Sequence, residues 1–185
     1  MMPNCTIHRQ RIMQINVPGL LLFLAVSLAL LSCSRTLYVV RHAEKISSTD
    51  SAAKMMANDP PLSEAGKVRA IVLRDELKTK HIKHIYSTNT VRTRTTAEPL
   101  SQATKINIES YNNVDSLVNV IQSTKGNVLV VGHSNTVDDI VNKLCRQTKI
   151  AADLDDKEYD NLFVVKVRGK KRTFSRHKYG YPSNP

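Results

Sequence analysis

The chain has 185 residues, with 27 lysines and arginines against 16 aspartates and glutamates, and a formal net charge of +11. That length suits one globular domain, and 23% charged residues with six glycines and seven prolines exclude wholesale disorder and a collagen-like repeat. The three cysteines, Cys5, Cys33 and Cys145, have the spacing of neither a metal site nor a redox pair, which excludes a zinc module and a disulfide scaffold.

The first 32 residues have the composition of a secretory signal. Arg9 and Arg11 are followed by an almost continuous apolar run over residues 17–31, and no acidic residue occurs in this part of the chain. A membrane-spanning helix needs about 20 apolar residues, so this shorter run suits the apolar region of a signal peptide. We therefore expect residues 1–32 to be a signal peptide and residues 33–185 to form the mature domain.

The apolar run ends in Leu30-Leu31-Ser32-Cys33, which resembles the lipobox of bacterial lipoproteins. The resemblance implies cleavage before Cys33 and acylation of its thiol. The mature domain would then be lipid-anchored to a membrane of the bacterial cell envelope, outside the cytoplasm. The alternatives are an uncleaved anchor and an ordinary signal peptide in which Cys33 is incidental.

From residue 36 onward, the patterns of strands and helices alternate. The strand patterns cover residues 37–40, 84–87, 106–108 and 127–131, and the helical patterns cover residues 62–80, 91–103, 114–122 and 136–147. After an acidic loop at 151–160, residues 162–167 and 172–177 predict a terminal hairpin. Near-continuous apolar strands in this order predict a three-layer α/β/α fold around a mostly parallel sheet.

Candidate functional residues follow three of the predicted strands. In open α/β sheets, ligands bind beyond the carboxyl ends of the strands. The residues at these positions are Arg41-His42, Arg92 and Gly132-His133. Ser134 and Asn135 come next, at the start of a helix whose free N–H groups favour an anion. The planar guanidinium group of arginine matches the geometry of phosphate or carboxylate, and neutral imidazole is a nucleophile or base near pH 7. The pattern therefore predicts an anion site that requires no metal.

Four segments in order resemble the histidine phosphatase superfamily, whose fold is that of the phosphoglycerate mutases. They are LYVVRHAEK (37–45), DPPLSEAG (59–66), YSTNTVRTRTTAEPL (86–100) and VLVVGHSNT (128–136). The resemblance covers about residues 36–180, and the size of the chain is similar to that of the small phosphohistidine phosphatase branch.

The resemblance implies a role for each matching residue. His42 would attack phosphorus and carry a phosphohistidine intermediate. Arg41 and Arg92 would clamp the phosphoryl oxygens, and His133 would donate hydrogen bonds to them. Because a like charge disfavours imidazolium, Arg41 should also keep His42 unprotonated.

The proton donor is the least certain part of the predicted site. The chain lacks the long insertions that build a substrate pocket, and often supply the acid, in mutases and phytases, and Ala43 stands where the family usually has glycine. Glu109, at the end of the predicted third strand, is the first candidate by position, with Asp59 and Glu44 as rivals. A solvated surface carboxylate is the alternative interpretation of Glu109. Glu44 and Lys45 are expected at the mouth of the pocket, where Glu44 would contact substrate.

These features predict a metal-independent phosphatase without a cofactor, which hydrolyses phosphomonoesters of a small phosphorylated substrate. Export argues against cytosolic protein substrates and against a glycolytic mutase, and sugar phosphates or phosphorylated envelope components suit the compartment better. The alternative is a catalytically silent lipoprotein of the same fold that binds phosphate or other anions.

The C-terminal 25 residues carry seven lysines and arginines and no acidic residue. An edge hairpin protected by basic residues explains this strip without a ligand, and contact with anionic lipid is the alternative. Nucleic acid is not expected as a partner, because the strip has few aromatic residues, such as Phe174 and Tyr179, among its basic side chains and the chain is expected to be exported.

Overall fold

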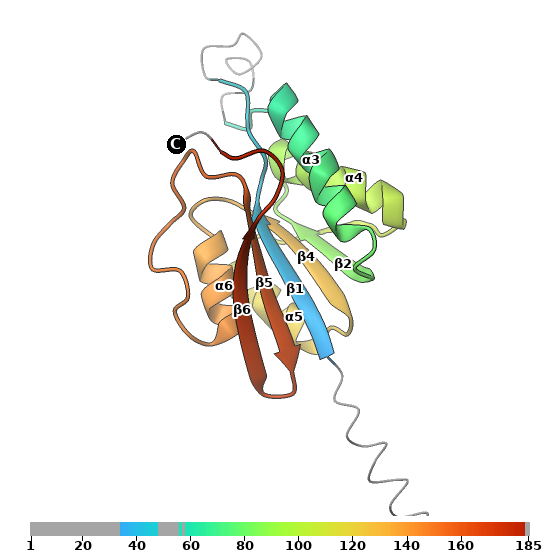
Figure 1. Cartoon of the computed structure of the whole chain (residues 1–185), viewed down its shortest axis with the longest axis vertical. Coiled ribbons are helices and arrows are strands. Elements are labelled where there is room, and N and C mark those ends of the chain that lie inside the picture. Colours follow the sequence, from blue (N-terminus) through green and yellow to red (C-terminus); the bar gives the residue numbers. More distant parts are fainter. Residues whose placement is uncertain (1–33, 48–55, 57, 184–185) are drawn as a thin grey trace, which may run out of the picture. The chain divides into compact units, whose positions relative to one another are not determined.

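A mixed sheet forms the middle layer of the computed structural model, which describes residues 34–47, 56 and 58–183 (Figure 1). The strands in this part of the chain are β1 (Ser34–Arg41), β2 (Ile82–Ser87), β3 (Ile108–Ser110), β4 (Asn127–Gly132), β5 (Asn161–Arg168) and β6 (Lys171–Lys178). They lie in the order β3-β2-β4-β1-β5-β6. Strands β3, β2, β4 and β1 are parallel to one another, whereas β5 is antiparallel to both β1 and β6. The predicted signal segment and Cys33 lie outside the described residues.

Helices cover both faces of the sheet (Figure 1). They are α3 (Glu64–Leu77), α4 (Val91–Thr104), α5 (Val114–Ser123) and α6 (Val137–Cys145). Because successive side chains of a strand point to opposite faces, β1 contributes to two cores. Leu37 and Val39 pack with α5 and α6, and Tyr38 and Val40 pack with α3 and α4. The predicted three-layer α/β/α fold, with its mostly parallel sheet and C-terminal antiparallel hairpin, is confirmed.

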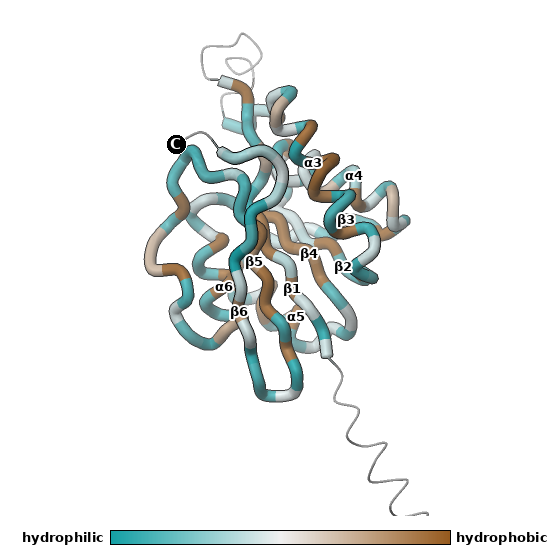
Figure 2. Tube along the Cα trace, viewed as in Figure 1, coloured by the Kyte–Doolittle hydropathy of each residue, from teal (hydrophilic) through white to brown (hydrophobic). Residues whose placement is uncertain are grey.

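The apolar strands predicted from the sequence form the centre of the molecule. Figure 2 shows apolar residues along β4 and β5, and Val128 to Val131 of β4 are completely buried. Such burial on both faces explains why these strands are continuously apolar rather than alternating. Among the described residues, no helix combines the length and the apolar character needed to cross a membrane.

The observed bounds differ from the predicted ones at two places that matter for the site. Helix α3 begins after Ser63, whose side chain accepts a hydrogen bond from the Gly66 N–H, as expected of an N-cap. Strand β3 lies two residues later than predicted, because α4 continues to Thr104 and ends at Lys105 in the left-handed conformation, with φ 60°. Glu109 is therefore the middle residue of β3 and not its end.

The register of the strands brings the functional residues to one edge. Arg41 of β1 pairs with Gly132 of β4, and Ser87 of β2 pairs with Val131, so these three parallel strands end side by side. Strand β5 runs in the opposite direction and places Phe163 beside Val39. The loop that precedes β5 therefore reaches the same edge as the residues that follow β1.

Candidate active site

A cavity of about 480 Å³ opens at this edge of the sheet. Its lining consists of cationic, imidazole and small polar side chains and one carboxylate: Arg41, His42, Lys45, Arg92, His133, Ser134, Asn135 and Asp156. Of the seven residues that sequence analysis placed at the strand ends and at the following helix start, all except Gly132 thus line one cavity. Lys45, expected at the mouth of the pocket, also lines it.

His42 is held as a neutral imidazole with one defined tautomer. Its backbone N–H donates to the Gly132 carbonyl at 2.9 Å, and its Nδ1 lies 2.8 Å from the Ala43 carbonyl oxygen. A carbonyl oxygen can only accept, so Nδ1 carries the proton and Nε2 keeps its lone pair. Burial, together with the nearby charges of Arg41 and Arg92, lowers the pKa of His42 to about 3. The side chain is therefore an unprotonated nucleophile at neutral pH.

His133 follows β4 directly, and its ring lies edge-on to that of His42, with 5.5 Å between the centroids. Nη2 of Arg92 donates to its Nδ1 over 3.4 Å. Nε2 therefore carries the proton and donates to Oγ1 of Thr88 at 2.9 Å. Burial and the charge of Arg92 lower the pKa of His133 to about 4. The cavity thus holds two neutral imidazoles between cationic groups.

Arg41 is only 3% exposed and is held by the loop that precedes β5. Its Nη1 donates to the Asp155 carbonyl at 2.7 Å, and its Nη2 lies 3.3 Å from the carboxylate of Asp156. The guanidinium also lies over the ring of Tyr159, 4.3 Å from the centroid. The Nε–H is buried and makes no hydrogen bond within the described residues.

Arg92 is oriented by a carboxylate from a distant segment. Its Nη1 donates to Oδ1 of Asp59 at 2.9 Å, while Oδ2 of the same carboxylate accepts from the Val91 N–H at 2.8 Å. Val91 is the first residue of α4, where a negative charge complements the helix dipole. Asp59 therefore fixes both the start of α4 and the direction of the Arg92 side chain toward His133.

Two other predicted residues do not line this cavity. Glu44 points toward α3, where its carboxylate accepts from Nε and Nη2 of Arg69 at 2.8 and 2.6 Å. Gly66 permits this approach, since a Cβ there would lie 2.1 Å from the Glu44 carbonyl oxygen. Glu109 is 54% exposed on β3 and lies 3.5 Å from Nδ1 of His84. Glu44 thus forms an ion pair with Arg69, and the carboxyl of Glu109 lies on another surface.

Sequence reasoning missed three residues of the site: Thr88, Asp156 and Tyr159. Thr88 follows β2 directly, so the same argument from strand ends could have identified it. Asp156 and Tyr159 lie in the loop before β5. The sequence predicted that loop only as the segment that leads into the terminal hairpin, with nothing to place it near the other strand ends. Only the antiparallel pairing of β5 with β1 brings that loop to the cavity.

The chemistry of the cavity is that of oxyanion binding beside a nucleophile. Two guanidinium groups and one ammonium group line the cavity together with His42. Fixed cations of this kind stabilise the charge that spreads over the equatorial oxygens of a phosphoryl group in transfer. Within the described residues, no group of three or more histidine, cysteine, aspartate or glutamate side chains is arranged to hold a metal ion.

A family model described as the histidine phosphatase superfamily (branch 1) matches residues 37–115. The matched region runs from β1 into α5 and includes Arg41, His42 and Arg92, whereas His133 lies beyond it. No curated protein matches the chain significantly.

The solved structures that resemble this chain include proteins named for different phosphorylated compounds. The protein histidine phosphatase SixA in complex with tungstate is 16% identical, with a TM-score of 0.60, and the match covers 77% of this chain and 96% of that one. A phosphoglycerate mutase from Bacillus anthracis is 19% identical, with a TM-score of 0.56, and the match covers 78% of this chain and 92% of that one. A mycobacterial glucosyl-3-phosphoglycerate phosphatase is 10% identical, with a TM-score of 0.58, and the match covers 78% of this chain and 98% of that one. At these identities the similarity establishes the fold alone.

Proposed function

We propose that the chain is a histidine phosphatase, in line with the family match over residues 37–115, and that it hydrolyses phosphomonoesters through a phosphohistidine formed on Nε2 of His42. The observation that carries this proposal is the hydrogen bond from Nδ1 of His42 to the Ala43 carbonyl. It leaves the Nε2 lone pair free in a cavity that also contains Arg41 and Arg92. A nucleophile with a lowered pKa beside fixed cations is what phosphoryl transfer requires.

The reaction would proceed in two steps. In the first, Nε2 of His42 attacks phosphorus, the bond between phosphorus and the ester oxygen breaks, and the alcohol leaves with a proton. In the second, water attacks the phosphohistidine and returns a proton to the group that protonated the alcohol, the N–P bond breaks, and inorganic phosphate and free His42 are released. Arg41, Arg92 and Lys45 would balance the charge of the phosphoryl oxygens in both steps.

Contacts within the catalytic cavity support binding of a dianion. The carboxylate of Asp156, which is 89% exposed, occupies Nη2 of Arg41 in the way that a phosphate oxygen would. The buried Nε–H of Arg41 has no partner within the described residues, and an unsatisfied buried donor costs about 1–3 kcal/mol. A phosphate dianion would replace the exposed carboxylate, and a shift of the guanidinium toward it could also satisfy that donor. A neighbour of the same fold holds tungstate, an oxyanion that resembles phosphate.

The proton for the leaving alcohol needs a different source from the one expected. Glu109 and Glu44 do not line the cavity, and both oxygens of Asp59 are engaged by Arg92 and the start of α4. Asp156 is the carboxyl group that lines the cavity in the part of the chain that the structure describes. We infer that Asp156, or water bound beside it, protonates the leaving group. The high exposure of this side chain allows it to leave Arg41 when phosphate binds.

We also propose that Cys33 is acylated and that the domain is exported. Cys33 directly precedes β1, whose first residue, Ser34, pairs with Arg168 of β5. The adjoining turn of the hairpin carries the basic residues Arg168, Lys170, Lys171 and Arg172. The anchor would thus place a basic turn beside anionic lipid headgroups. The cavity lies at the other end of β1, roughly 25 Å away for an eight-residue strand.

Hydrolysis of an aryl phosphate by the full chain, with and without a chelator, tests the proposed activity. We expect metal-independent turnover that is lost in His42→Ala. If the wild-type protein binds phosphate and hydrolyses no ester, the chain is instead an anion-binding protein of this fold.

A further inference from the structure

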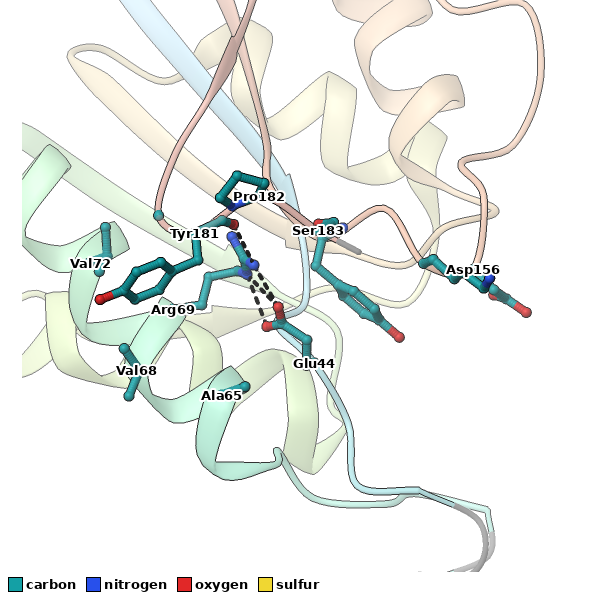
Figure 3. Close-up of a pocket in the computed structure, with 12 residues that line it drawn as sticks. Glu44, Ala65, Val68, Arg69, Val72, Asp156, Tyr181, Pro182 and Ser183 are labelled. Atoms are coloured by element: carbon teal, nitrogen blue, oxygen red, sulfur yellow. Dashed lines mark hydrogen bonds and ion pairs between the residues drawn. The ribbon is translucent and has the colours of Figure 1, made fainter. Parts of the chain in front are cut away.

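A second and larger cavity, of about 830 Å³, adjoins the catalytic cavity. It lies between α3 and the C-terminal segment 179–183, and we call it the lateral groove (Figure 3). Asp156 lines both cavities, so the two are adjacent at the loop before β5. The mechanism proposed above gives the lateral groove no role.

Tyr159 forms the wall between the two cavities. It lines the lateral groove, and the guanidinium of Arg41 lies over its ring. The centroid of the same ring is 6.0 Å from that of His42. A group attached to a phosphoryl oxygen near His42 can therefore reach the lateral groove along Tyr159.

The outer part of the lateral groove is apolar. Ala65, Val68 and Val72 line it from α3, and Tyr181 and Pro182 line it from the C-terminal segment. Val68 is 45% exposed and Tyr181 is 76% exposed, which leaves an apolar surface without a partner in the described chain. Figure 3 shows the Tyr181 ring on the side of Val68 and Val72, and Asp156 on the other side of the Arg69–Glu44 pair. Apolar surface at a concave site is typical of ligand recognition.

The floor of the lateral groove is fixed by hydrogen bonds. Arg69 is buried, and besides its ion pair with Glu44 it donates to the carbonyl oxygens of Tyr179 and Tyr181 at 2.8 and 2.9 Å. Gly180 between them has a φ of +68°, a conformation that side chains rarely adopt. The C-terminal segment is thus fastened to α3 through a buried charged network, and the groove is preformed.

We propose that the lateral groove binds the aromatic part of a phosphomonoester whose phosphoryl group occupies the catalytic cavity. The proposal rests on the phosphatase function given above and names the substrate class, the phosphate ester of an alcohol that carries an extended aromatic group. Tyr159 and Tyr181 line the groove with aromatic rings, and Val68 and Val72 line it with aliphatic side chains, which suits such a group. The ion pair of Glu44 then positions α3 and the C-terminal segment and does not contact the phosphate.

Two esters test the lateral groove: phenyl phosphate and 4-biphenylyl phosphate, whose leaving phenols have similar acidity. With full-length wild-type protein we expect kcat/KM to be about tenfold higher for the biphenylyl ester, because its second ring buries apolar surface in the groove. Val68→Asp should remove this preference. Tyr181→Ser, at a more exposed position, tests the same contact if Val68→Asp does not fold.

Ile71→Asp is the matched control, because Ile71 is also on α3, is 43% exposed and does not line the lateral groove. It should keep the preference of the wild-type protein. Equal kcat/KM for the two esters, or equal effects of Val68→Asp and Ile71→Asp, would overturn the proposal. If neither ester is hydrolysed, the phosphatase function is wrong. Calorimetric binding of the two esters then tests whether the lateral groove binds the aromatic group. Tighter binding of the biphenylyl ester, weakened by Val68→Asp, would support the groove, and equal binding would overturn it.

Discussion

Asp59 and Arg92 form a 2.9 Å ion pair between segments 33 residues apart, and this pair directs Arg92 toward His133. The second oxygen of Asp59 accepts from the first N–H of α4. A carboxylate with both oxygens engaged is suited to positioning and is a poor proton donor. We therefore assign Asp59 a positioning role and not that of the acid that protonates the leaving group.

Asp59→Asn should lower kcat/KM about tenfold, or about 1.4 kcal/mol, because the amide can still accept from Val91 but no longer forms an ion pair with Arg92. The loss should be equal for aryl phosphates with good and with poor leaving groups, since the change affects the orientation of Arg92. Kinetics with a series of substituted phenyl phosphates measures this. A loss confined to poor leaving groups would make Asp59 the acid after all.

Arg92→Lys should lower kcat/KM at least tenfold, which corresponds to about 1.4 kcal/mol, because lysine keeps the charge but loses the planar fork. Arg94→Lys is the control: Arg94 lies on the same helix and is exposed, and among the described residues its side chain donates only to Ser110. Steady-state rates of the two variants under identical conditions give the comparison. Similar rates for both variants would show that Arg92 does not bind the phosphoryl group.

The acidic limb of the pH–rate profile should lie near pH 3–4. The pKa of His42 is lowered to about 3 and that of His133 to about 4, so both imidazoles stay neutral as the pH falls through 6.5, the ordinary value for histidine. Activity is lost only when protonation removes the lone pair of His42. Rates for an aryl phosphate between pH 3 and 8, with brief exposure to acid, measure this limb. A limb near pH 6.5 that stays in place when the ester is exchanged for one with a more acidic phosphate group would mean that His42 is not desolvated as described.

The residues at the strand ends could be predicted from the sequence, whereas the direction of some side chains could not. Arg41, His42 and His133 follow apolar strands, and parallel strands share one carboxyl edge whatever the details of packing. Glu44 is next to the same edge, but its side chain turns toward Arg69, a partner 25 residues away on α3. Periodicity does not fix such a contact, because it depends on how closely α3 approaches the loop after β1.

The sequence placed Glu109 close to the catalytic cavity, which it does not line in the structure, for a related reason. The sequence pattern located β3 to within two residues, and this small error moved Glu109 from the end of the strand to its middle. Asp156 is in a loop without periodicity, and its place at the cavity depends on the antiparallel pairing of β5 with β1. Both errors concern the register of segments and not the kind of element.

Cys33→Ser should release the full-length protein from the membrane fraction without changing kcat for an aryl phosphate, because acylation would require the thiol. More than one acyl chain makes membrane binding durable. Fractionation of cells, with mass spectrometry of the mature N-terminus, measures the change. An unmodified Cys33 with residues 1–32 still attached would replace the lipoprotein with a simple membrane anchor.

The most direct measurement is to quench the full-length protein in denaturant during turnover of an aryl phosphate and to locate the covalent phosphate by mass spectrometry. The account predicts one phosphoryl group on His42, labile to acid and stable to base, and its absence in His42→Ala. Phosphate on a serine, or full turnover by His42→Ala, would contradict it.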